Sequence, residues 1–174
     1  MAINTQNNIG DIEIENAYIF SKNFKGVKRV NPRTNKVVNA EGTRGFCVRI
    51  DDVNIAQTMA ADGWNVKINP SENPGEAPFC YLPVEARFNN FPPTIYMVSG
   101  GRAHELDVNH VHQLDDRRFS KVNLVIHPRR YQTDDGEWRI KAFLSEGWFY
   151  IEQSRFAEEW AAQQNNNYDE EVPF

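Results

Sequence analysis

The residues most able to support catalysis lie in the stretch HELDVNHVHQLDD, residues 104–116. Histidines and carboxylates are ligand types of metal-dependent nucleases, but their spacing here matches no motif with a known mechanism. On a strand only His110 and His112 would share a face, and a catalytic metal needs a third protein ligand. We therefore expect no catalysis, no metal and no cofactor, and a metal-dependent DNA-processing enzyme remains an alternative.

The segment Lys22–Arg44 carries a strong local excess of positive charge. Its cations are Lys22, Lys25, Lys28, Arg29, Arg33, Lys36 and Arg44, and Glu41 is its single acid. Asn, Gly and Pro residues between two strand-forming segments predict a long loop. Cations together with an aromatic residue, Phe24, suit a flexible phosphate backbone. We expect this basic arm to bind nucleic acid, and a solvated loop that only aids solubility is the alternative.

Further cations and rings are predicted to face outward from strands. In WRIKAFL, residues 138–144, the alternation assigns Trp138 and its alternate neighbours to the core and Arg139, Lys141 and Phe143 to solvent. Exposed rings stack on bases without regard to sequence, although each ring could instead pack beneath a loop. The residues expected on this surface outside the arm are Arg49, Tyr96, Arg102, Arg129, Arg130, Tyr131, Arg139, Lys141 and Phe143.

The last residues of the sequence combine three acids with an apolar tip. They are Asp169, Glu170, Glu171, Val172, Pro173 and Phe174, and they follow the polar stretch 163–167. A ring with a terminal carboxylate fits an apolar pocket with a basic rim, and the acids speed the approach to a basic partner. We expect this tail to bind other proteins.

Composition excludes several other classes of protein. The chain has 19 basic and 24 acidic residues, and five of those acids follow Arg155, so the preceding body is neutral. No apolar run is long enough to span a membrane, and the first residues lack a secretory signal, so we expect a cytoplasmic location. Cys47 and Cys80 lie in apolar segments and are predicted to be buried free thiols.

The remaining pattern is one of many short strands with turns between them. Strands are predicted at 12–20, 44–50, 64–68, 79–88, 94–99, 120–128, 138–144 and 148–152. Helices are predicted at 53–61 and 154–163, and Asp134-Asp135-Gly136 indicates a hairpin turn. This pattern predicts an all-β, OB-fold-like small barrel with long loop insertions, minor helices and a disordered acidic tail.

Several stretches resemble a family of bacteriophage single-stranded DNA-binding proteins. They are NAYIFSKNFKGV, RGFCVRIDD, ADGWNVKI, FPPTIYMVSGGR, NLVIHPRRY and IKAFL, and they span most of residues 16–144. The last residues are similar to the acidic tip of bacterial single-stranded DNA-binding proteins, with Val172 in place of an isoleucine. The resemblance implies an OB-type barrel that coats single strands during phage replication or recombination.

We therefore expect a DNA-binding domain at residues 1–157 and a linker with a partner-binding tail at residues 158–174. The expected partners are single-stranded DNA and replication or recombination proteins. The sequence leaves both a monomer and a homo-oligomer as alternatives. A different class of protein is an adaptor or inhibitor that binds host replication proteins through the tail and has no affinity for DNA.

Overall fold

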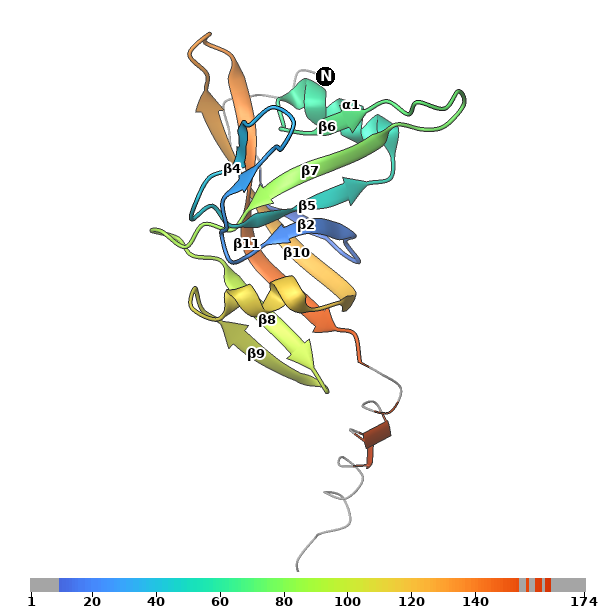
Figure 1. The fold of residues 1–174 in the computed structure, drawn as a ribbon, viewed down its shortest axis with the longest axis vertical. Helices are drawn as coiled ribbons and strands as arrows, with labels where there is room; N and C mark the ends of the chain where they lie inside the picture. The colour runs from blue at the N-terminus through green and yellow to red at the C-terminus, as the bar shows by residue number, and fades with distance from the viewer. Residues whose placement is uncertain (1–9, 154–155, 157–158, 161, 164–174) are drawn as a thin grey trace, which may run out of the picture.

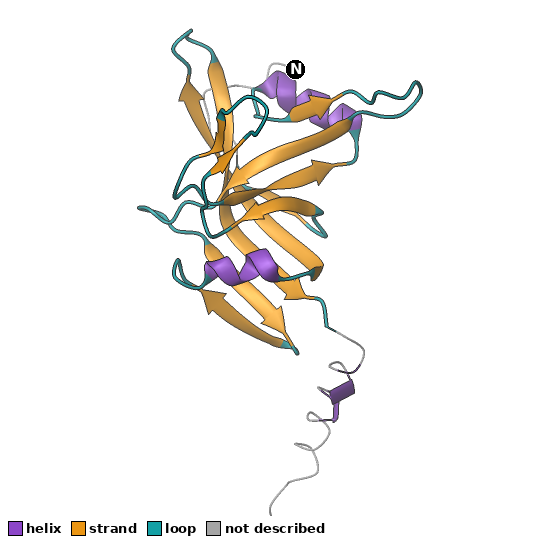
Figure 2. Cartoon of the chain, in the orientation of Figure 1, coloured by secondary structure: helices purple, strands orange, loops and turns teal. Residues whose placement is uncertain are grey.

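The computed structural model describes residues 10–153, 156, 159, 160, 162 and 163, and strands dominate it (Figures 1 and 2). The strands are β1 (Ile12–Ile14), β2 (Ile19–Asn23), β3 (Arg29–Val30), β4 (Val37–Asn39), β5 (Gly45–Ile50), β6 (Lys67–Asn69), β7 (Phe79–Glu85), β8 (Thr94–Ser99), β9 (Arg102–Leu106), β10 (Phe119–Gln132) and β11 (Trp138–Ile151). Residues 10–153 also contain helix α1 (Val53–Asp62) and the 3-10 helix η1 (Val111–Asp116). The described residues of the predicted helix 154–163, which are 156, 159, 160, 162 and 163, are helical.

The main sheet closes on itself through its first strand. Its order is β1-β10-β11-β7-β5-β2, and β1 and β2 are successive parts of one interrupted strand. The prediction of one continuous strand at 12–20 is therefore wrong. Asn16 adopts φ +51, a left-handed conformation that asparagine tolerates, and the chain changes there from pairing with β10 to pairing with β5. The closed order, with β7 parallel to β11, confirms the predicted OB-like barrel.

The longest elements are β10 and β11, which form one antiparallel hairpin (Figure 1). The predicted turn at Asp134-Asp135-Gly136 is confirmed, with the Gly136 N–H donating to the Thr133 carbonyl at 2.9 Å. The two predicted strands 138–144 and 148–152 are one strand, because the ladder to β10 continues past Gly147 after a register shift between Val125 and Ile126. The hairpin extends beyond the barrel, which leaves Trp138 57% exposed rather than in the core.

Aromatic residues fill the barrel interior. Phe24, Phe46 and Phe149 are almost fully buried, and the ring centroids of Phe24 and Phe149 lie 5.5 Å apart at an interplanar angle of 86°. Gly147 is required beside them, because a Cβ at this position would lie 2.6 Å from the Phe149 ring. Strand alternation therefore directs every second residue into the interior and leaves the intervening residues outside.

Helix α1 follows the predicted boundaries closely. The Asp52 carboxylate accepts the N–H of Asn54 at 2.9 Å, and Gly63 ends the helix in a left-handed conformation. The predicted strand 64–68 is shorter in the structure, where β6 covers Lys67–Asn69 and Trp64 forms an isolated bridge to Ile140. In the part of the chain that the structure describes, no helix is long and apolar enough to cross a membrane.

Strands β8 and β9 form a second hairpin that extends the sheet at its other end (Figure 1). Strand β8 pairs in parallel with the second half of β11, from Glu146 to Tyr150. Strands β8 and β9 are joined by a tight turn at Gly100-Gly101, where both glycines have positive φ. This hairpin therefore lies about 30 Å along β11 from its start at Trp138, at about 3.3 Å per residue.

Candidate nucleic-acid interface

The outer face of the β10–β11 hairpin gathers cations and rings. The register pairs His127 with Phe143, Arg129 with Lys141, and Tyr131 with Arg139. Residues directly opposite each other in an antiparallel ladder share a face, so these six side chains form one surface. All are exposed except Phe143, which is half-buried. Five of these residues were expected on the binding surface from the sequence alone, namely Arg129, Tyr131, Arg139, Lys141 and Phe143.

A groove lies beside this surface, between the hairpin and the loop that follows β7. It has a volume of about 730 Å³, and its lining includes Arg87, Phe91, His127, Arg129 and Phe143. The Phe91 side chain is 93% exposed, although phenylalanine is among the residues most often buried. The Nδ1 atom of His127 lies 2.7 Å from the Asp11 carboxylate. The groove therefore offers both positive charge and aromatic faces to one ligand.

Ion pairs neutralise part of this surface. Lys141 pairs with Glu85 at 2.5 Å, and Arg139 pairs with Glu137 at 2.7 Å. The paired cations are about half exposed, and pairs of this kind contribute little to stability. Both partners are exposed in the Arg139–Glu137 pair, so an incoming phosphate can replace Glu137 at small cost, whereas the Glu85 side chain beside Lys141 is only 19% exposed. Within residues 10–153, no ion pair is formed by Arg129 or Arg87.

A second group of rings covers the outer face of β2 and β7. We call Phe20, Phe79 and Tyr81 the ring cluster, because their centroids lie 5.4 to 5.7 Å apart. Tyr81 pairs in register with Arg49 of β5, whose guanidinium lies 4.4 Å from the centroid of the Tyr18 ring. Phe79 is 43% exposed, so the cluster presents ring surface to solvent. In an OB-type barrel this face and its flanking loops contact oligonucleotides.

The basic arm is a built hairpin rather than an unstructured loop. Strands β3 and β4 pair within it, and the Asp115 carboxylate fixes its base by accepting the N–H groups of Phe24 and Lys25 at 2.8 and 2.9 Å. The side chains of Lys25, Lys28, Arg29, Arg33 and Lys36 are exposed. The arm connects β2 to β5, where the sequence pattern predicted it.

The two cysteines are free thiols that differ in burial. Burial raises the pKa of the half-buried Cys47 thiol, and the positive charge of Arg29 lowers it in part. The other thiol, Cys80, is buried as predicted, while Cys47 is only partly so.

Three residues of the arm do not present their side chains to a ligand. Phe24 is 0% exposed in the core, which corrects its expected role on the surface. The Lys22 ammonium donates to the carbonyls of Leu114, at 2.8 Å, and Arg117, and it lies 4.5 Å from the centroid of the Phe119 ring. Burial lowers the pKa of Lys22, and nearby Asp115 and Asp116 raise it in part. Arg44 is half-buried, 5.8 Å from the Phe88 centroid.

Three other predicted residues lie apart from this surface. Tyr96 stacks on Trp148 with a centroid separation of 4.1 Å, on the part of the sheet that β8 extends. Arg102 is exposed at the start of β9, in the same extension. Arg130 points to the opposite side of the hairpin from Arg129, and it lies 5.5 Å from the Trp138 centroid. The sequence pattern could not separate these positions from the groove.

The structure adds residues to the site that the sequence analysis omitted. Arg87 and Phe91 belong to a loop, and the ring cluster depends on pairing between segments far apart in the chain. Only Phe91 carried a local signal, since it stands among asparagines and prolines where a buried ring is uncommon. Arg87 and the ring cluster carried no local signal, because only the tertiary fold brings them to the site.

The histidine-rich stretch has a structural use. Asp107 accepts the N–H of Asn109 and pairs with His110 Nδ1 at 2.6 Å, just before η1. The hydrogen bond from His110 lowers the pKa of Asp107. Across the described residues, no group of three or more His, Cys, Asp or Glu side chains is placed to hold a metal ion.

Comparison with known families decides the class of this protein. The family model described as "Putative phage ssDNA-binding domain" matches residues 1–172. The chain belongs to this family. Among curated proteins, no sequence matches it.

Two solved structures resemble this phage ssDNA-binding domain in fold. Both are of the single-stranded DNA-binding protein from bacteriophage Enc34, and one is a complex with ssDNA. The complex aligns with a TM-score of 0.50 and 12% identity over 84% of this chain and 89% of that one. The other structure aligns with a TM-score of 0.50 and 12% identity over 86% and 85%. This likeness supports the barrel assignment, while the site stands on the geometry above.

The contacts of Lys22 generate a prediction that separates stability from binding. Lys22→Met removes the donor of two carbonyls, so we expect the free energy of unfolding to fall by about 1–3 kcal/mol. We expect the affinity for a short oligothymidylate to stay unchanged. The matched control, Lys25→Met, should reverse this pattern, because Lys25 is exposed on the arm. Urea unfolding measures the stability, and fluorescence anisotropy measures the affinity. Weaker DNA binding by Lys22→Met with unchanged stability would mean that Lys22 contacts DNA.

Proposed function

We propose that this phage ssDNA-binding domain binds single strands across the outer face of its barrel, with little preference for sequence. The observation that carries the proposal is the groove, where Arg87 and Arg129 stand beside the accessible rings of Phe91 and Phe143. Family membership supports it, as does the fold shared with a protein that was solved with ssDNA.

The chemistry of the surface accounts for each part of this function. Exposed guanidinium and ammonium groups pair with phosphates and release counterions, which makes affinity fall as salt rises. Each base stacked on a ring contributes roughly 1–3 kcal/mol, and every base has a face to stack. Duplex bases are already stacked on each other, so the rings gain little from a duplex. Phosphate contacts carry no sequence information, so we expect the proposed site to show little preference for base sequence.

We propose DNA contacts from the arm, β5, the β10–β11 hairpin, the loop after β7 and the ring cluster. The residues expected from the sequence and retained are Lys25, Lys28, Arg29, Arg33, Lys36, Arg49, Arg129, Tyr131, Arg139, Lys141 and Phe143. Arg87, Phe91 and the ring cluster join them on the evidence of the structure. We propose residues 1–157 as the DNA-binding domain that contains this surface.

The tail is proposed as a separate module for partner recruitment during phage replication or recombination. Residues 164–174 lie outside the described part of the chain, so the proposal rests on their sequence alone: three acids, then Val172-Pro173-Phe174. Proline limits the entropy lost on docking, and a basic partner attracts the acids. We propose residues 158–174 as this linker and tail.

The DNA-binding proposal is tested by removing charge from two of its elements. The double variant Arg33→Gln/Arg129→Gln should weaken binding to oligothymidylate several-fold. If each residue neutralises one phosphate, the slope of log K against log salt should fall by about 1.4, at about 0.7 per phosphate. The control is Arg102→Gln, an exposed cation on the distant β8–β9 hairpin. An unchanged slope in the double variant, or an equal loss in the control, would contradict the proposed surface.

The tail is tested by removing residues 169–174. We expect partner capture to be lost while DNA affinity stays the same or rises, because the acids no longer compete for the cations. Phe174→Ala should reproduce the loss of partner binding alone. Pull-down with replication proteins and anisotropy with oligothymidylate measure the two properties. Loss of DNA binding on truncation would mean that the tail is part of the DNA-binding domain.

A further inference from the structure

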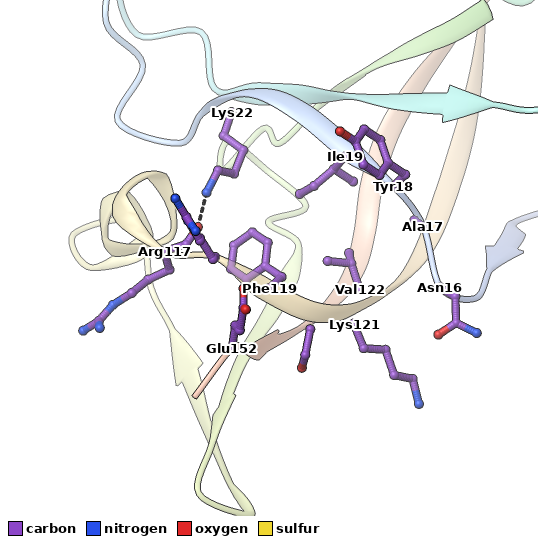
Figure 3. A pocket seen from close by; sticks show the side chains of 12 residues that line it. Asn16, Ala17, Tyr18, Ile19, Lys22, Arg117, Phe119, Lys121, Val122 and Glu152 are labelled. Atoms are coloured by element: carbon purple, nitrogen blue, oxygen red, sulfur yellow. Dashed lines mark hydrogen bonds between the residues drawn. The ribbon is translucent and has the colours of Figure 1, made fainter. Parts of the chain in front are cut away.

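A pocket opens where the first strand of the barrel is interrupted (Figure 3). It has a volume of about 570 Å³ and lies between residues 16–19 and residues 117–122. The gap arises because the chain leaves β10 after Ile14, turns at Asn16 and joins β5 from Ile19 onward. The Ala17 N–H still donates to the Val122 carbonyl at 2.8 Å, which fixes the rim. We call this cavity the side pocket.

Cations and rings make up half of the lining of the side pocket. Its cations are Lys22, Arg117, Arg118 and Lys121, its rings are Tyr18 and Phe119, and its single acid is Glu152. Within residues 10–153, none of these cations forms an ion pair, in contrast to Arg49, Arg139 and Lys141. The pocket therefore keeps a local excess of positive charge.

The cations differ in how free they are to meet a ligand. Figure 3 shows Lys22 directed at the Arg117 carbonyl, so its donors are largely committed within the protein. The side chains of Arg118 and Lys121 are exposed, and the Lys121 ammonium lies 5.1 Å from the centroid of the Tyr150 ring. Arg117 is exposed as well, so Arg117, Arg118 and Lys121 are the three cations of the pocket that are open to a phosphate.

The side pocket continues the proposed DNA surface rather than standing apart from it. Tyr18 lines the pocket and is 57% exposed, and the Arg49 guanidinium lies over its ring. Arg49 is paired with Tyr81, which belongs to the ring cluster. Rings and cations therefore follow one another from the ring cluster through Arg49 and Tyr18 to Arg118 and Lys121.

We propose that the side pocket is a second subsite for the same single strand, which binds its backbone phosphates after the strand has crossed β5 and β7. The pocket combines positive charge with accessible ring edges, and this combination suits nucleotides of an unpaired strand. This inference rests on the proposed function. It extends the DNA footprint around the barrel to the opening between β1 and β2.

The experiment compares oligothymidylates of two lengths on the full chain. Sites on OB-type barrels take about 4–16 nucleotides, so a strand of about 6 tests the groove and one of about 16 reaches the pocket. For Arg118→Gln/Lys121→Gln we expect at least fivefold weaker binding of the longer strand and less than a twofold change for the shorter one. The salt slope for the longer strand should fall by about 1.4, which corresponds to two phosphates.

Two controls keep the outcomes distinct. Arg102→Gln should leave both affinities unchanged, and the single reversal Lys121→Glu should reproduce the length-dependent loss if the double variant folds poorly. Equal loss for both lengths, or no loss for the longer strand, overturns the second subsite. If the unmodified chain binds neither length, the proposed function itself has failed.

Discussion

The register between β10 and β11 is the constraint on which the other features of this barrel depend. It directs Ile126, Ala142 and Leu144 into the core and turns Arg129 and Lys141 outward. A slip of one residue would exchange the two faces, burying cations and exposing the apolar side chains. The cost of such an exchange, several kcal/mol for each unpaired buried charge, holds the register in place. Formation of the core therefore also forms the candidate interface.

The same logic explains how a neutral body can bind a polyanion. Basic and acidic residues of the body balance in number, but they lie in different places. The arm, the β10–β11 hairpin and the side pocket each expose cations, while acids such as Asp52 and Asp115 accept hydrogen bonds in turns and caps. The binding of a phosphate depends more on the local electrostatic potential than on the net charge of the protein. The rings add an attraction that salt does not screen, so affinity has both a salt-sensitive and a salt-insensitive part.

The sequence predicted the strands and helices better than the tertiary contacts between them. Alternation in WRIKAFL gave the inner and outer faces correctly from Arg139 to Leu144, because strand periodicity is a local property, but it placed the exposed Trp138 in the core. Phe24 and Lys22 were misplaced, because the fold draws the start of the arm into the barrel, where Phe24 meets Phe149 and Lys22 meets η1. The ring cluster could not be predicted at all, since Phe20 and Phe79 become neighbours only through the pairing of β2, β5 and β7.

The most direct test of the account is a fluorescence titration with an oligothymidylate and with a matched duplex, at low and moderate salt. Trp138 lies on the side of the hairpin opposite to Arg129, so the signal is read from a fluorescent label on the oligonucleotide and not from tryptophan emission. The account predicts a strong signal change with the single strand, weaker binding as salt rises, and much weaker binding of the duplex. Equal binding of the two forms, or no binding of either, would contradict a surface built to stack unpaired bases.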